Sequence, residues 1–169
     1  MADDEARHFE LLQNRLIELG SYYGEWPAHD GLWEAAHATR HDLAARLAIV
    51  PLVLEARGLD VTPVMIARFK RQADDATVSI LETILSDEVD HVAAGHRWFK
   101  YLCQKNGQNP AKLFQDLVRE HYRGQIKPPF NDSARKAAGF DSTYYSPLVP
   151  ETLKPTTYGG LAVPKSAIL

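Results

Sequence analysis

Two copies of one short pattern contain residues that could carry out chemistry. Asp4-Glu5-Ala6-Arg7-His8 lies near the start of the chain and Asp87-Glu88-Val89-Asp90-His91 near its middle, and both read D-E-x-x-H. Positions i and i+3 of an α-helix share a face, so the Glu and His of each copy can reach one point in space. Carboxylate and imidazole ligands together suit iron, manganese or zinc. The pattern therefore predicts a metal site.

Both copies lie on apolar stripes of predicted helices. Glu5 and His8 continue the spacing of Leu12, Leu16 and Leu19, and the second copy occupies the stripe of Leu81, Ile84, Glu88, His91, Gly95 and Phe99. Buried unpaired charges cost several kcal/mol each, and metal coordination offsets that cost. The alternative is a solvated helix face, which is common for a single E-x-x-H and less expected for two copies on core stripes.

A third carboxylate has a similar apolar setting. Glu55 follows Pro51-Leu52-Val53-Leu54, and the midpoint between Glu55 and Glu88 falls at Arg71–Gln72, beside a polar stretch at 72–75. If the chain folds back there, the helical segments from Glu55 to the turn and from the turn to Glu88 are each about 25 Å long. Both carboxylates then lie side by side, at the same distance from the turn. The alternative is an exposed Glu near a helix end at Gly58.

The elements that must position these residues are helical. Periodicity of 3.6 predicts helices over 3–19, 32–57, 62–72, 76–104 and 110–122, with a short one over 132–138. Pro51 should kink the second helix, and Gly58 and Pro63 should interrupt it. No segment alternates strictly with period two, so we expect an all-α helical bundle over 1–122, a wrapping segment over 123–149 and a weakly ordered tail over 150–169.

The composition is that of a globular protein. The 169 residues suit one domain, and 45% are hydrophobic and 24% charged. The net charge of −3 argues against a general nucleic-acid-binding surface. Cys103 is the one cysteine, which suits a reducing compartment. Because the N-terminus is acidic and the longest apolar run, 47–54, is too short to span a bilayer, we expect a cytoplasmic protein without membrane contact.

These motifs resemble a known family. Two helices with Glu-x-x-His and two with a lone Glu are the ferritin-like di-iron carboxylate pattern. More closely, DEARHFELL, LVLEARGLDVTP, DEVDHVAAGHRWF and IKPPFN with ARKAAGF resemble the ferritin-like domain-of-unknown-function family numbered 455. More distantly, the chain is similar to the tRNA-modifying di-iron hydroxylases. In the family numbered 455, another helix with a sixth ligand, a lone Glu, precedes the first Glu-x-x-His. The chain thus looks truncated at its N-terminus, and we expect self-association through the groove left open.

The resemblance implies two iron ions, with manganese as an alternative, and an oxidase or monooxygenase of unknown substrate and redox partner. Glu5 and Glu88 would bridge the metals, His8 and His91 would each bind one, and Glu55 would be a terminal ligand. The competing hypotheses are a metal-binding protein without turnover and a metal-free structural or interaction fragment. A tRNA substrate is a weaker alternative, which would use a mild basic patch of Arg119, Arg123, Lys127, Arg135 and Lys136.

The aspartate before each Glu suggests an outer partner for a metal-bound imidazole. Because each His ring turns inward, its second nitrogen should face across the bundle. We therefore expect a crossed pairing of Asp87 with His8 and of Asp4 with His91, whereas Asp90 lies on another helix face. His96, five residues after His91, should also point elsewhere.

Overall fold

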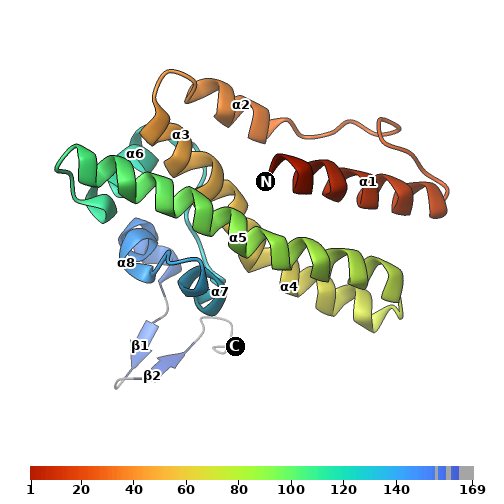
Figure 1. The fold of residues 1–169 in the computed structure, drawn as a ribbon. Helices are drawn as coiled ribbons and strands as arrows, with labels where there is room; N and C mark the ends of the chain where they lie inside the picture. The colour runs from red at the N-terminus through yellow and green to blue at the C-terminus, as the bar shows by residue number, and fades with distance from the viewer. Residues whose placement is uncertain (155, 159–160, 164–169) are drawn as a thin grey trace.

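The computed structural model describes residues 1–154, 156–158 and 161–163, and its packed body is all-α (Figure 1). Helix α1 comes first, and α2 and α3 follow a loop. A π-helical segment, η1, then joins α3 to α4, and the long α5 runs back along α4. The elements in chain order are α1 (Ala2–Glu18), α2 (Gly31–Ala38), α3 (Leu43–Ile49), η1 (Val50–Glu55), α4 (Ala56–Arg71), α5 (Asp75–Lys105), α6 (Pro110–His121), α7 (Asp132–Ala137) and α8 (Ser142–Tyr145).

Helices α4 and α5 form an antiparallel hairpin that turns at residues 72–74 (Figure 1). Asp74 stabilises the turn because its Oδ1 accepts a hydrogen bond from the Thr77 backbone N–H at 3.0 Å, which caps α5. A small cluster of Ile66, Val78 and Leu81 packs the two arms together near this end. The polar stretch predicted to turn the chain does so.

The main core lies at the other end of α5, where α3, η1, α6, α7 and α8 surround it. Phe114 stands at its centre, with its ring edge-on to Phe99, Phe140 and Tyr144 at centroid distances of 6.4, 5.2 and 5.9 Å. These aromatic side chains are all buried. The residues after α6 therefore complete the core.

Four predicted helices begin and end within one residue of their expected ranges: α1, α5, α6 and α7. The helix predicted over 32–57 instead breaks at residues 39–42. Asp42 Oδ1 accepts hydrogen bonds from the N–H groups of Ala44 and Ala45 at 2.7 and 3.0 Å, so it caps a new helix. Thr39 Oγ1 returns a hydrogen bond to the Ala35 carbonyl at 2.8 Å and closes the preceding helix. Local side-chain capping outweighs the apolar period here.

The expected interruption at Gly58 and Pro63 is absent, because α4 runs unbroken through both. Proline has no N–H to give to the carbonyl four residues earlier, that of Leu59. The side-chain amide of Asn131 donates to that carbonyl instead, at 3.1 Å. A group distant in sequence thus satisfies the acceptor that Pro63 leaves open.

The wrapping segment is also held to α4 by a buried ion pair. Arg135 donates to both carboxylate oxygens of Asp60, at 2.8 and 2.6 Å, and its guanidinium lies 4.5 Å from the ring centroid of Tyr145. Both charged residues are almost fully buried. The basic patch expected over 119–136 is therefore not one surface, since Arg135 is internal and Arg119 pairs with Asp116 at 3.2 Å.

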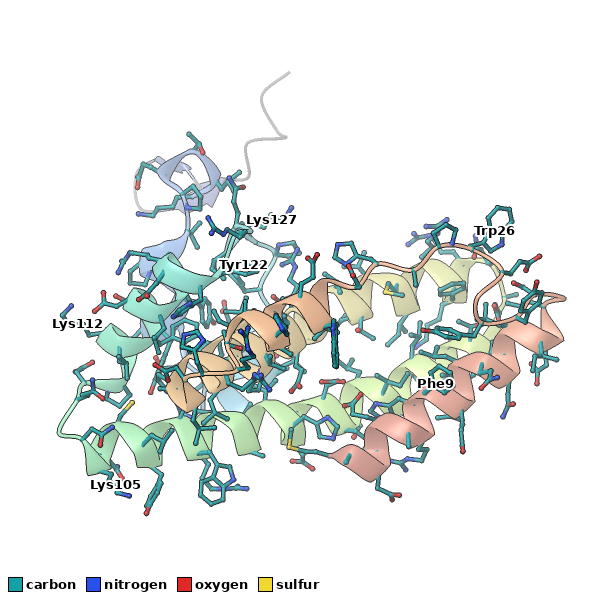
Figure 2. All side chains as sticks on the ribbon, turned by 90° about the horizontal axis from the view of Figure 1, so that it is seen from above. Phe9, Trp26, Lys105, Lys112, Tyr122 and Lys127 are labelled. Carbon is teal, nitrogen blue, oxygen red and sulfur yellow. The ribbon has the colours of Figure 1, made fainter. Side chains whose placement is uncertain are left out.

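Helix α1 packs on α5 along one side only, and His8 is its one buried residue. The stripe predicted to be core is largely uncovered: Phe9 is 45% exposed, Leu12 43% and Leu19 60%. The loop after α1 is also aromatic and exposed, and Figure 2 shows Trp26, 74% exposed, projecting outward from it. The ring of Phe9 meets that of Tyr23 edge to face at 5.1 Å between centroids, and most of this apolar surface remains exposed.

Part of the tail predicted over 150–169 (155, 159–160 and 164–169) lies outside the described residues. The rest contains a 3-10 turn at Glu151–Leu153 and an unpredicted hairpin in which β1 (Thr156–Tyr158) pairs antiparallel with β2 (Leu161–Val163). Another 3-10 turn, Ser146–Leu148, follows α8. Within the described ranges, none of the helices combines the length and apolar character needed to cross a bilayer.

Candidate metal centre

The two D-E-x-x-H segments meet where α1 crosses α5. The rings of His8 and His91 lie 5.9 Å apart between centroids. His8 Nε2 lies 2.9 Å from Asp87 Oδ2, and His91 Nε2 lies 3.0 Å from Asp4 Oδ2. These are the two crossed pairs expected from the sequence, and they relate the segments by a near two-fold axis.

The aspartates determine which imidazole nitrogen is available to a ligand. The pKa of Asp4 is held well below its usual range, first by the hydrogen bond from His91 and then by the chain's amino group and Arg7, so Asp4 is an acceptor. Nε2 of His91 must therefore carry a proton and donate it. In the neutral ring the lone pair is then on Nδ1, the nitrogen that faces the glutamates.

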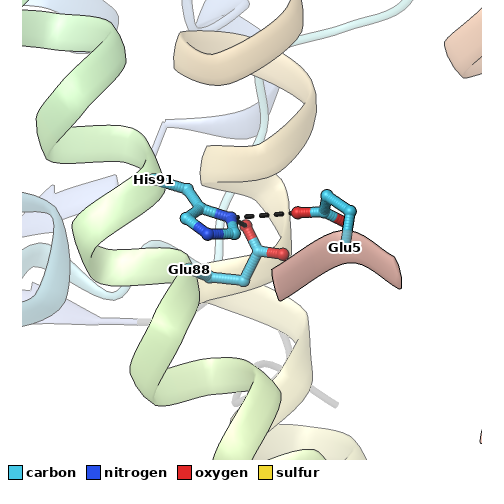
Figure 3. Close-up of side chains that lie close together, drawn as sticks. All are labelled: Glu5, Glu88 and His91. Carbon is cyan, nitrogen blue, oxygen red and sulfur yellow. Dashed lines mark ion pairs between the residues drawn. The ribbon is translucent and has the colours of Figure 1, made fainter. Parts of the chain in front are cut away.

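Glu5, Glu88 and His91 converge at the crossing (Figure 3). Each offers one ligand atom, and these atoms all lie within 4.8 Å of one another. His91 Nδ1 is 3.0 Å from Glu5 Oε1 and 3.9 Å from Glu88 Oε2, and His8 Nδ1 is 3.8 Å from Glu5 Oε2. Two metal–ligand bonds of about 2.0–2.2 Å separate their donor atoms by at most about 4.4 Å. The distances from His91 Nδ1 to the two glutamates, 3.0 and 3.9 Å, lie within that limit.

Three buried polar atoms in this region have no hydrogen-bond partner: Glu55 Oε2, Glu88 Oε2 and His91 Nδ1. His91 Nδ1 is close to Glu5, but that contact lacks hydrogen-bond geometry. Each unsatisfied buried group costs free energy, and native proteins leave few of them. All three are atoms that bind metals, so the residues present fit a bound cation.

The pKa shifts of the buried side chains also favour a bound cation. Burial, followed by repulsion from Glu88 and Glu5, raises the pKa of the Glu55 carboxyl to about 7. Burial and then Glu5 also raise the pKa of Glu88. Burial by itself would lower the pKa of His91, but its hydrogen bond to Asp4 and the surrounding carboxylates raise it. The crowding of Glu55 and Glu88 with Glu5 thus forms a partly buried acidic site in which a bound cation would offset the carboxylate charge.

Helix η1 positions Glu55, which is its last residue. Pro51 in its first turn has no N–H for a regular α-helical bond, and a π-helical turn accommodates this and shifts the residues that follow. Gly95 of α5 packs directly on Pro51, and a Cβ at Gly95 would lie 2.4 Å from Pro51 Cβ. This close approach brings the segment carrying Glu55 against the helix carrying Glu88 and His91.

The family model described as "Protein of unknown function (DUF455)" matches residues 1–146. The chain belongs to this family. An uncharacterized protein of Haemophilus influenzae (strain ATCC 51907 / DSM 11121 / KW20 / Rd) is 44% identical to the DUF455 chain over 140 residues, which are 83% of this chain and 49% of that protein. The chain thus spans about half the length of this relative. No solved structure gives a significant match.

All seven residues singled out in the DUF455 chain lie at the crossing of α1, α5 and η1. Glu5, Glu88 and His91 share one point, His8 faces them across the axis, and Glu55 is close enough for Glu5 and Glu88 to perturb its pKa. Sequence reasoning missed Arg7. Its Nη2 lies 3.1 Å from Asp4 Oδ1 and 2.8 Å from Asp87 Oδ2, so one guanidinium holds both outer aspartates. Its position three residues after Asp4 was the available signal.

Proposed function

We propose that this chain binds two metal ions, iron in the first instance, through Glu5, His8, Glu55, Glu88 and His91. The observation that carries the proposal is the set of three buried, unpartnered ligand atoms on Glu55, Glu88 and His91. In the proposed arrangement Glu5 and Glu88 would be shared between the two ions. His8 and His91 bind one ion each, and Glu55 is a terminal ligand. Manganese, which accepts the same ligand types, is the alternative metal.

The outer residues would hold the ligands in their binding state. Asp4 and Asp87 accept from the Nε2–H groups, which fixes the ring orientation and makes Nδ1 a better donor to a metal. Arg7 pairs with both aspartates and so helps to hold them in position. Leu52 and Val92, both fully buried near the ligands in sequence, contribute to the dry side of the site.

We further propose that α1, α4 and α5, with η1, are part of a ferritin-like di-iron carboxylate fold, and that the chain is a cytoplasmic oxidoreductase with a separate redox partner. The support is the ligand set and the resemblance in its motifs. Two ferrous ions held there would supply electrons for the reduction of dioxygen. The chain's own residues would hold the ions, balance their charge and limit access of water from the η1 side.

Anaerobic titration of the metal-free chain with ferrous iron, followed by elemental analysis, tests the binding proposal. We expect about two equivalents for the parent chain and clearly fewer for His91→Ala. His37→Ala, on exposed α2, is the matched control and should bind as the parent does. Absence of binding by the parent would refute the proposal. Oxygen consumption by the loaded chain then separates an oxidoreductase from a metal carrier.

A further inference from the structure

A second site lies on the face of α5 turned away from the metal ligands. A cavity of about 510 Å³, open to solvent, lies between α5 and α7, two helices that pack against each other below the α4–α5 hairpin (Figure 1). Its volume is in the range of small-molecule sites. Its lining includes His96, Arg97, Lys100 and Tyr101 of α5, with Ala137 and Gly139 at and just after the end of α7.

The charge of the cavity is positive. Arg97 and Lys100 form no ion pair or hydrogen bond with any residue that the structure describes, whereas most other arginines in the described chain have a carboxylate or carbonyl partner. Asp141 interacts electrostatically with His96 and Lys100, and its Oδ1 accepts hydrogen bonds from the Thr143 N–H and hydroxyl, where it caps α8. Arg97 and Lys100 thus line the cavity without an ion-pair partner among the described residues, and the one acid that Lys100 influences, Asp141, leaves an excess of positive charge.

His96 adds a directed donor. It is 7% exposed, and its Nε2 lies 3.0 Å from the Tyr144 hydroxyl. Burial raises the pKa of Tyr144 to about 12, so the phenol keeps its proton. It donates that proton to Nε2, because the opposite arrangement would leave a buried hydroxyl proton without an acceptor. Burial, and then Lys100, lower the pKa of His96 to about 4. The neutral ring therefore carries its one proton on Nδ1.

Gly139 keeps that nitrogen accessible. A Cβ at this position would lie 3.0 Å from His96 Nδ1 and would cover it. Its φ of +76° also favours glycine, as expected just after the end of α7. The Nδ1–H edge is thus exposed at the floor of the cavity, below the two cations.

We propose that this cavity binds a small organic phosphate monoester. The phosphate oxygens accept from His96 Nδ1–H and pair with Arg97 and Lys100, whose two charges match the nearly dianionic group. The organic part lies against Tyr101 and Ala137. A carboxylate has the same acceptor chemistry but half the charge, and a polynucleotide would need a continuous basic surface that the buried Arg135 does not provide.

Calorimetric titration of the full chain with phenyl phosphate, inorganic phosphate, benzoate and a uridine decanucleotide tests the proposal. We expect phenyl phosphate to bind most tightly and to shift the NMR signal of the His96 Nδ1–H, which binding at the metal ligands would not do. Arg97→Gln/Lys100→Gln should weaken phenyl phosphate binding roughly tenfold or more. Arg68→Gln/Arg71→Gln, which removes the same charge from exposed α4 positions, should change it less than twofold.

Ala137→Leu keeps every charge and occupies the part of the cavity assigned to the organic group, so it should weaken binding of phenyl phosphate while leaving the melting temperature unchanged. Equal weakening by the two charge variants, an unmoved His96 signal, or tighter binding of benzoate or the decanucleotide than of phenyl phosphate would each overturn the proposal.

Discussion

Glu55→Gln should stabilise the metal-free chain at pH 8, even though it removes a proposed metal ligand. Glutamine keeps the shape of the side chain and removes the charge that is costly to bury beside Glu88 and Glu5. Burial and these two neighbours raise the pKa of Glu55 from its ordinary value of 4.5 to about 7. At 1.36 kcal/mol per pKa unit, that difference corresponds to a penalty on the order of 3 kcal/mol once the group ionises.

The sign follows from proton linkage. The folded chain holds the Glu55 proton more tightly than the unfolded chain, so this contribution to stability is fully present below about pH 4.5. It is lost as the pH rises through about 7. The free energy of unfolding of the metal-free parent should therefore fall between these values. The glutamine variant should lack that part of the fall, and Glu88, whose pKa is also raised, accounts for what remains.

Urea denaturation with a chelator present, at pH 5 and pH 8, measures the effect. Glu10→Gln, an exposed substitution on α1, is the matched control and should change stability by less than about 0.5 kcal/mol. With ferrous iron in place of the chelator the order should reverse, because binding stabilises the parent and not the variant. A glutamine variant that is less stable than the parent at pH 8 in chelator, or an unchanged pH slope, would refute the reasoning.

Three further outcomes follow from the geometry. Asp87→Ala should weaken metal affinity about 10- to 100-fold in competition with a chelator, while Asp90→Ala, on an exposed face, should bind as the parent does. Gly95→Ala should lower the free energy of unfolding by about 1–3 kcal/mol, because the new Cβ would clash with Pro51. Helix propensity by itself would instead raise the free energy of unfolding by about 1 kcal/mol. An increase of that size would contradict the packing argument. The chain should self-associate through the exposed face of α1, and Leu12→Lys should reduce this in light scattering; a parent that stays monomeric at high concentration would count against it.

The 3.6-residue periodicity of apolar residues was sufficient to predict the helices whose start, end and buried face depend only on nearby residues. The spacing of apolar residues predicts α1 and α5 almost to the residue, because amphipathic helices of this length carry their own start, stop and face. The same register placed both D-E-x-x-H segments facing one region. It also predicted the crossed pairing of Asp87 with His8. When two helices with the same motif pack with their histidines facing each other, the second ring nitrogen of each histidine points toward the aspartate of the other helix.

Other features depend on contacts between residues far apart in the chain. The sequence predicts a break at Pro63, but α4 continues unbroken. The Leu59 carbonyl, which Pro63 leaves open, accepts a hydrogen bond from Asn131, 72 positions away in the sequence. From the sequence, Arg135 is expected to be a cation on the surface. In the structure it is buried, because Asp60 forms an ion pair with it. Helix α1 reads as a core helix and is half uncovered because the described chain supplies no second helix to pack on it.

The candidate metal site likewise depends partly on local sequence and partly on contacts between distant residues. The sequence by itself determined the ligand types and their spacing, because i, i+3 geometry is a property of any helix. The tertiary structure decided how Glu55 is brought near them, because its position depends on the π-helical turn at Pro51 and on Gly95 admitting that turn against α5. Local hydrogen bonding fixes where a side chain points from its own helix, whereas packing between helices decides which side chains it meets.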